Sequence, residues 1–133
     1  MFEEALFRHL TSSNGVYAMT GDRVYPVMLP QNCPLPAISY LKVSADRLHS
    51  LQGDTGYTMP VFQISARAGT YAECKSLAEQ IRLSLQNFSG IMGGTDGTDI
   101  CAVLLIGELE GYEPDTNSWY NHMDFKFYYE ERM

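Results

Sequence analysis

Two residues of the chain have types and a spacing that suit acid–base chemistry. His122 and Asp124 lie two positions apart in a strand-like segment, so both side chains point to one face of the predicted strand. A serine beside them would complete the Ser-His-Asp constellation of nucleophilic hydrolases. The sequence contains no Gly-x-Ser-x-Gly motif and no recognisable oxyanion-binding device. We therefore interpret His122 and Asp124 as members of cross-strand pairs on a polar sheet face.

A glycine-rich segment, residues 89–99, has the composition of a loop that could bind an anion or a cation. Phosphate-binding loops follow a strand and open a helix, whereas this segment follows a predicted helix and precedes a predicted strand. Asp96 and Asp99 offer two carboxylates, but they lack the spacing and the terminal glutamate of a helix-loop-helix calcium site. The sequence predicts a flexible solvated loop, with glycines at Gly90, Gly93, Gly94 and Gly97.

The histidines and cysteines do not have the spacing of a metal site. His9, His49 and His122 are far apart in the sequence, and none forms a ligand motif with another. Three cysteines, widely separated and without a Cys-x-x-Cys pair, argue against both a disulfide framework and a zinc site; they are Cys33, Cys74 and Cys101. We expect no metal, no cofactor and no catalysis.

The net charge of −7 is unevenly distributed along the chain. Residues 83–125 contain no lysine or arginine, so part of the surface is expected to be acidic and to disfavour tight binding of nucleic acid. Four carboxylates crowd a segment that is predicted to be a turn, residues 108–115, and form the candidate acidic cluster: Glu108, Glu110, Glu113 and Asp115. A turn that its charges keep soluble would have the same composition.

Length and composition predict one soluble domain over residues 1–133. The chain has 133 residues and 45% hydrophobic content, which suits a single core. The first residues carry acids where a secretory signal carries basic residues, and no apolar run approaches ~18 residues. We expect a protein made in a cytoplasm, with no membrane partner.

A strand followed by an amphipathic helix organises the middle of the chain. Residues 61–67 alternate between apolar and polar side chains, as in a half-buried strand. Thr70 and Glu73 have the spacing of a capping box, so a helix should begin near Tyr71 and end before Gly90, which would supply a left-handed cap. One stripe of this helix is apolar, formed by Cys74, Leu77, Ala78, Ile81 and Leu85.

Four strands and two helices account for the rest. Residues 2–11 form a short helix, and residues 37–44 form a strand that is joined to residues 61–67 by a polar loop in an antiparallel hairpin. Residues 100–107 are nearly all apolar, which predicts a central strand covered on both faces, and residues 119–129 alternate as a final strand. The predicted fold is α+β: a mainly antiparallel four-stranded sheet with one long amphipathic helix packed on it and a short N-terminal helix.

Four segments carry a resemblance to a known family. They are residues 21–26 (Gly-Asp-Arg-Val-Tyr-Pro), 30–40, 70–73 (Thr-Tyr-Ala-Glu) and 112–115 (Tyr-Glu-Pro-Asp). In this order and spacing they resemble the tail-completion, or tail-terminator, proteins of long-tailed bacteriophages and prophages, over almost the whole chain. The chain departs from the family pattern at Arg67, where an apolar or aromatic residue is usual, and in its glycine-rich loop.

The resemblance implies a structural role without catalytic residues. Proteins of this family assemble into a ring, usually six-fold, on the end of the tail tube, stop its growth and offer a surface to the head connector. The partners implied are therefore other copies of the chain, the tail-tube protein and the head-connector protein. DNA would pass through the ring without specific binding, and the acidic cluster would face the lumen or a partner. The protein would be made in the host bacterial cytoplasm and reside in the tail or neck of the virion.

Two alternatives from other functional classes remain compatible with the residues. One is a small α+β domain that binds or transforms a small molecule. The other is an acidic inhibitor of the immunity type, which blocks a basic partner.

Overall fold

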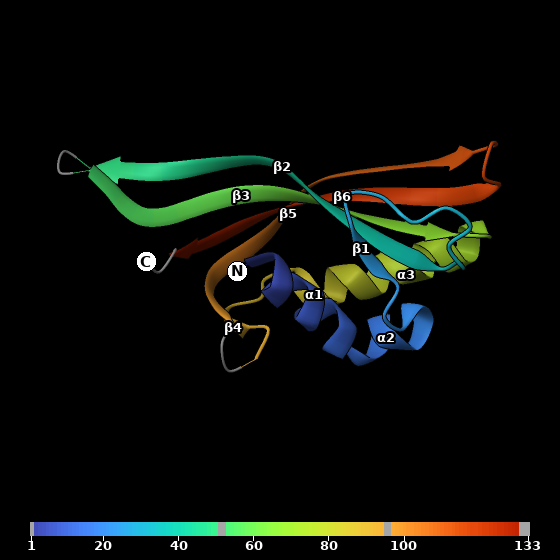
Figure 1. Ribbon diagram of the computed structural model, residues 1–133, viewed down its shortest axis with the longest axis horizontal. Helices are drawn as coiled ribbons and strands as arrows, with labels where there is room; N and C mark the ends of the chain where they lie inside the picture. The colour runs from blue at the N-terminus through green and yellow to red at the C-terminus, as the bar shows by residue number, and fades with distance from the viewer. Residues whose placement is uncertain (1, 51–52, 95–96, 131–133) are drawn as a thin grey trace.

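The structure, a computed structural model, describes residues 2–50, 53–94 and 97–130. Three helices, α1 (Phe2–Ser12), α2 (Asn14–Thr20) and α3 (Tyr71–Leu85), lie together on one side of a sheet (Figure 1). The strands are β1 (Val24–Pro26), β2 (Ala37–Ser50), β3 (Gly53–Ala68), β4 (Gly90–Met92), β5 (Thr98–Glu113) and β6 (Ser118–Glu130). None of the helices described is long and apolar enough to cross a membrane.

The sheet has six strands in the order β1-β2-β3-β6-β5-β4. Strand β1 pairs with β2 in parallel, and every other neighbouring pair is antiparallel. The prediction of a four-stranded antiparallel sheet with one long helix is therefore wrong. The chain forms a mixed, strongly curled six-stranded sheet, resembling half a barrel, with three short helices.

The elements that the prediction missed or gave only in part are short. Strands β1 and β4 have three residues each, too few to show an alternating pattern, although Pro26 limits the short extended piece at residues 23–25 to an edge or an end, where β1 lies. Helix α2 begins at Asn14, directly after the Ser12-Ser13 pair, in a stretch whose polar and glycine residues are typical of a helix end. These three elements are positioned by tertiary contacts that no local pattern encodes.

Helix α3 begins where the sequence predicts. The amide of Glu73 donates to Thr70 Oγ1 at 3.2 Å, which confirms the threonine half of the capping box. All five residues of the predicted stripe are buried. The prediction that Gly90 closes the helix is wrong: α3 ends at Leu85, and Asn87 supplies the left-handed residue with a φ of 63°, a conformation that asparagine tolerates.

The core lies between the helices and one face of the sheet, called here the inner face. Alternation along β3 and β6 brings Phe62, Ile64, Met123, Phe125 and Phe127 to this face, where each is at most 1% exposed. The α1 residue Phe2 packs among these rings, with its centroid 5.1 Å from that of Phe62 and 4.9 Å from that of Phe127. Among the described residues, no helix covers the opposite, outer face.

Two long hairpins lie at opposite ends of the sheet, and the β2–β3 hairpin extends well beyond the helices (Figure 1). One joins β2 to β3 where a polar loop was predicted. The other joins β5 to β6 through the turn at residues 114–117, in which the amide of Asn117 donates to the carbonyl of Pro114. Strand β5 is not covered on both faces as predicted, because Leu104 and Ile106 are 43% and 54% exposed.

Candidate functional site

The candidate acidic cluster lies on a strand, not on a turn as predicted. Strand β5 continues to Glu113, and only Asp115 lies in the turn. In the ladder with β6, Glu108 pairs with Met123 and therefore points to the inner face. Glu110 shares that face, whereas Glu113, which lies an odd number of residues away, points to the outer face. The sheet thus divides the cluster between its two faces.

Two of the four carboxylates are paired with cations. Glu110 lies 3.1 Å from Lys75 Nζ and accepts from the Tyr71 hydroxyl at 3.0 Å, and these hydrogen bonds lower the pKa of Glu110. Glu113 lies 3.0 Å from Arg67 Nη1, which also donates to Ser118 Oγ at 2.9 Å. The pairing reduces the negative potential that the four carboxylates could present together.

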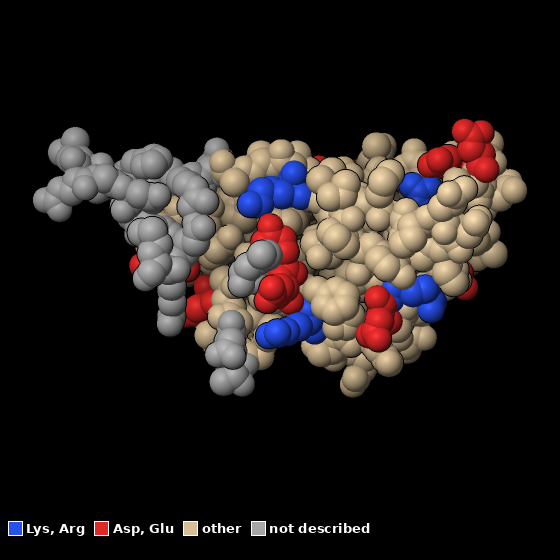
Figure 2. Space-filling model, in the orientation of Figure 1, with Lys and Arg blue, Asp and Glu red and all other residues tan. Residues whose placement is uncertain are grey.

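Acidic side chains nevertheless mark the far end of the β5–β6 hairpin. In Figure 2, red atoms gather at the tip of this hairpin at the upper right, with a basic side chain beside them. Glu108 accepts a bond from Asn121 Nδ2 at 3.1 Å and has no cation in the ion pairs described. Glu108 and Asp115 are therefore the two carboxylates of the cluster without a described ion pair.

The serine that could accompany His122 is Ser65, on the neighbouring strand β3. Ser65 Oγ lies 2.6 Å from His122 Nδ1. Asp124 does not bond the imidazole: its Oδ1 accepts from Gln63 Nε2 at 3.5 Å. A catalytic triad needs the histidine to bridge serine and carboxylate through its two nitrogens, which this arrangement does not do. The residues form the cross-strand pairs that the sequence predicts.

The surroundings of His122 favour its neutral form. Burial, followed by the nearby positive charge of Arg67, lowers the pKa of His122 below its ordinary value of 6.5. The ring also stacks on Tyr120, with the centroids 4.5 Å apart. The contacts of His122 with Ser65 and of Asp124 with Gln63 stabilise the pairing of β3 with β6.

The described part of the glycine-rich segment has a packing role. Gly93 has a φ of 88°, and a Cβ on it would lie 2.6 Å from the Cα of Ala5 in α1. Only glycine therefore allows this backbone to approach the helix so closely. Asp96 lies outside the described residues, and Asp99 is exposed on β5. In the described parts of the chain, no three His, Cys, Asp or Glu side chains group as metal ligands would.

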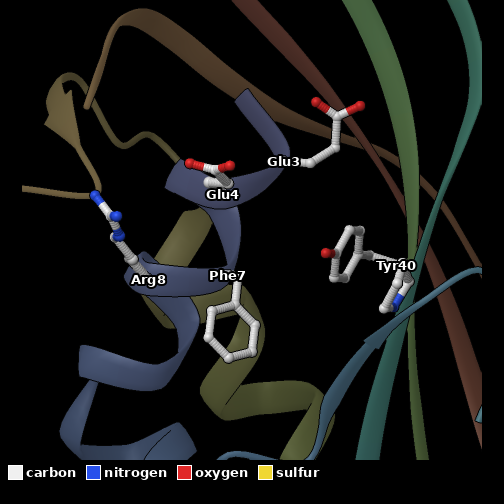
Figure 3. Close-up of a pocket in the computed structure, with 6 residues that line it drawn as sticks. Glu3, Glu4, Phe7, Arg8 and Tyr40 are labelled. Atoms are coloured by element: carbon white, nitrogen blue, oxygen red, sulfur yellow. The ribbon is translucent and has the colours of Figure 1, made fainter. Parts of the chain in front are cut away.

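An open hollow lies between α1 and the first strands. Its volume is about 540 Å³, and it is lined by Glu3, Glu4, Phe7, Arg8, Pro26 and Tyr40. In Figure 3 the rings of Phe7 and Tyr40 lie on either side of it, while the Arg8 guanidinium points away from both. Polar groups do not converge on one point as they do in a ligand site.

The largest feature that sequence reasoning missed is a set of apolar side chains at the two open margins of the sheet. Leu104, Ile106 and Leu109 on β5 are 43%, 54% and 64% exposed, and Leu41 and Val43 on β2 are 41% and 54% exposed. The apolar run of β5 was visible in the sequence but was interpreted as a covered strand. Exposed apolar groups beside open strand edges are typical of assembly surfaces.

Comparison with known families assigns the chain to a protein family. The model of the family described as "Tail completion protein gp17" matches residues 4–129. The chain belongs to this tail completion protein family. The resemblance expected from the sequence is thereby confirmed, and the tail completion protein has a structural role in a phage-like tail.

A solved structure has the same fold as this tail completion protein. It is a chain of the "Virion of native gene transfer agent (GTA) particle", with a TM-score of 0.76 and 14% sequence identity. The alignment covers 94% of this chain and 91% of that chain. At this identity the likeness concerns the fold. A comparison with curated protein sequences found no match.

Proposed function

We propose that this tail completion protein closes the head-proximal end of the tail tube and takes part in joining the tail to the head. The observation that carries the proposal is the family match over residues 4–129, nearly the whole chain. The fold supports it, since its outer sheet face and parts of two strand edges are left uncovered in the described chain, as suits a subunit that completes its packing in an assembly. The role is structural and non-enzymatic.

The assembly is a closed ring of copies of this chain, most simply a hexamer. A heterologous contact, in which one surface of a subunit meets a different surface of the next, closes into a ring when the rotation fits. The two sheet margins are such different surfaces. The ring contacts the tail-tube protein on one side and the head-connector protein on the other, and DNA passes through it.

The acidic cluster contributes to the lumen or to a partner contact of this ring. Because Glu108 and Glu113 point to opposite faces of the sheet, a single lumen wall would hold only one of them. An acidic wall does not bind phosphates, so it would let DNA slide during packaging and ejection. The protein acts in the neck of the virion, after synthesis in the host bacterial cytoplasm.

The test is inactivation of the gene in the phage or prophage that carries it. We expect free heads to accumulate together with tails of abnormal length, by electron microscopy of lysates. A plasmid copy of the gene should restore infectious particles, and an empty plasmid serves as the negative control. Normal particles without the protein would contradict the proposal.

A further inference from the structure

We propose that neighbouring copies of the chain join edge to edge, with residues 104–109 of β5 in one copy pairing antiparallel to residues 41–46 of β2 in the next. Glu108 then lies opposite Lys42 of the next copy, and Leu109 lies opposite Leu41. This inference rests on the proposed ring and defines its subunit contact.

Two strand stretches of the described chain have one side unpaired. On β2, strand β1 pairs with the edge only as far as Tyr40, opposite Pro26. The last hydrogen bond on this side runs from the amide of Val27 to the Tyr40 carbonyl, at 2.7 Å. On β5, strand β4 covers residues 98–100, and the amide of Asn87 donates to the Val103 carbonyl at 3.1 Å. The open stretches therefore begin at Leu41 and at Leu104.

The limits of these stretches allow one compact ladder. Strands β2 and β5 are separated by three antiparallel pairings, so they run in opposite directions in the sheet. A rotation about an axis along the strands keeps that relation, and a copy of β2 placed beside β5 is antiparallel to it. The covered parts of both strands limit the ladder at each end, and the register with Glu108 opposite Lys42 then pairs six residues of each strand.

Both open stretches contain a β-bulge, and the two bulges match. On β2 the register shifts between Lys42 and Ser44, so Lys42 and Ala45 face the inner side although they are three residues apart. On β5 the register shifts between Leu105 and Gly107, which likewise puts Leu105 and Glu108 on the inner side three residues apart. A bulge on one edge alone would throw a partner strand out of register. Matched bulges keep the two sides in phase.

The match between the two bulges indicates that the strand beside each open edge belongs to a second copy of the chain. With Glu108 opposite Lys42, the count along both strands puts Leu105 opposite Ala45, and all four residues share the inner face. A regular strand of another protein would lose this agreement past the bulge. The bulged residues Val43 and Ile106, both 54% exposed, come close together in the middle of the ladder.

Charge and apolar contacts agree with the same register. Lys42 is exposed on the inner face and lies 5.9 Å from the centroid of the Phe62 ring, without a carboxylate in the ion pairs described. Glu108 also has no cation in those pairs, so the two charges would compensate each other across the contact. On the outer face, Leu41 and Leu109 pair as exposed leucines and cover each other.

The experiment is disulfide trapping in assembled particles. The variant carries Leu41→Cys and Leu109→Cys, with Cys33 and Cys101 replaced by serine, and residues directly opposite in an antiparallel ladder are within disulfide range. On non-reducing gels of oxidised particles we expect a series of linked oligomers that ends at the ring size. The control pairs Leu41→Cys with Leu83→Cys, an exposed residue of α3, and should stay monomeric.

A charge exchange gives a second reading that does not depend on cysteines. Glu108→Lys and Lys42→Glu should each lower the yield of infectious particles, and the double variant should restore it at least tenfold over either single variant. Infectious cysteine particles without linked oligomers would overturn the edge contact while leaving the proposed function standing. Should the cysteine variant not assemble, failure of the charge exchange to rescue would overturn it equally. Normal particles from a strain without the gene would instead remove the proposed function itself.

Discussion

Arg67 Nη1 and Glu113 Oε2 lie 3.0 Å apart on the outer face of the sheet and tie the end of β5 to β3, across the intervening strand β6. The same guanidinium lies 5.5 Å from the centroid of the Tyr120 ring. At Arg67 the resemblance to the tail-completion family leads us to expect an apolar or aromatic residue, and the structure shows a polar cluster there instead.

We predict that Arg67→Met lowers the free energy of unfolding by about 1–2 kcal/mol. The variant loses the partly buried ion pair and leaves Ser118 Oγ with one donor fewer. Glu113→Gln should cost less, under about 1 kcal/mol, because the glutamate is more exposed and the amide still accepts a bond. Urea unfolding followed by circular dichroism measures both. Equal losses for the two variants would show that the ion pair, and not the additional contacts of Arg67, dominates.

Helix α3 gives a matched pair of core and surface substitutions. Ile81→Asp should cost about 3 kcal/mol or more, because it buries an unpaired charge at a position that is 0% exposed. Leu83→Asp on the same helix should change stability by less than about 0.5 kcal/mol, since Leu83 is 61% exposed. Thermal unfolding compares the two. A stable Ile81→Asp variant would contradict the packing of α3 on the sheet.

His122 should make stability depend on pH in a defined direction. Its pKa in the folded protein is lowered below the ordinary value of 6.5, so the unfolded chain takes up the proton first as the pH falls. The stabilising contribution is therefore complete above about pH 6.5 and is lost as the pH falls through the folded pKa. Between pH 7.5 and 5, the wild-type protein should lose more stability than His122→Gln does. Identical pH profiles would show that the histidine is not held neutral.

The acidic cluster is tested best one sheet face at a time. If the outer face lines the lumen, Glu113→Lys combined with Asp115→Lys should give joined particles that eject DNA poorly, because phosphates would bind the added lysines. Inner-face Glu110→Lys should then leave ejection normal, though it removes the ion pair with Lys75. DNA release triggered in vitro measures this. Failed joining in the outer-face variant would indicate a partner contact, and normal ejection in every variant would end the lumen hypothesis.

Strong local patterns made some elements predictable and left others hidden. The apolar stripe of α3 and the alternation of β6 each extend over more than ten residues, and the structure confirms the residues that they bury. The short strands β1 and β4 pair with partners distant in sequence, so their pairing could not be predicted from local propensity. Strand β5 was misjudged because its apolar run is exposed on one side, which only the sheet order reveals.

The candidate site could be predicted in part from the sequence. Had residues 108–113 been taken as a strand, their alternation alone would have separated Glu108 and Glu110 from Glu113. Gly111 and the following Pro114 favoured a turn instead. The bulges at Val43 and Ile106 leave no local signal, because each is defined by the residue that its partner strand lacks.

The central claim is that copies of this chain close the head-proximal end of the tail tube as a ring. A cryo-electron microscopy reconstruction of the neck of the mature particle tests it most directly. The account predicts a closed ring between tail tube and head connector into which the curled six-stranded fold can be placed, with β5 of each copy beside β2 of the next. A neck density that holds no copy of this fold would contradict it.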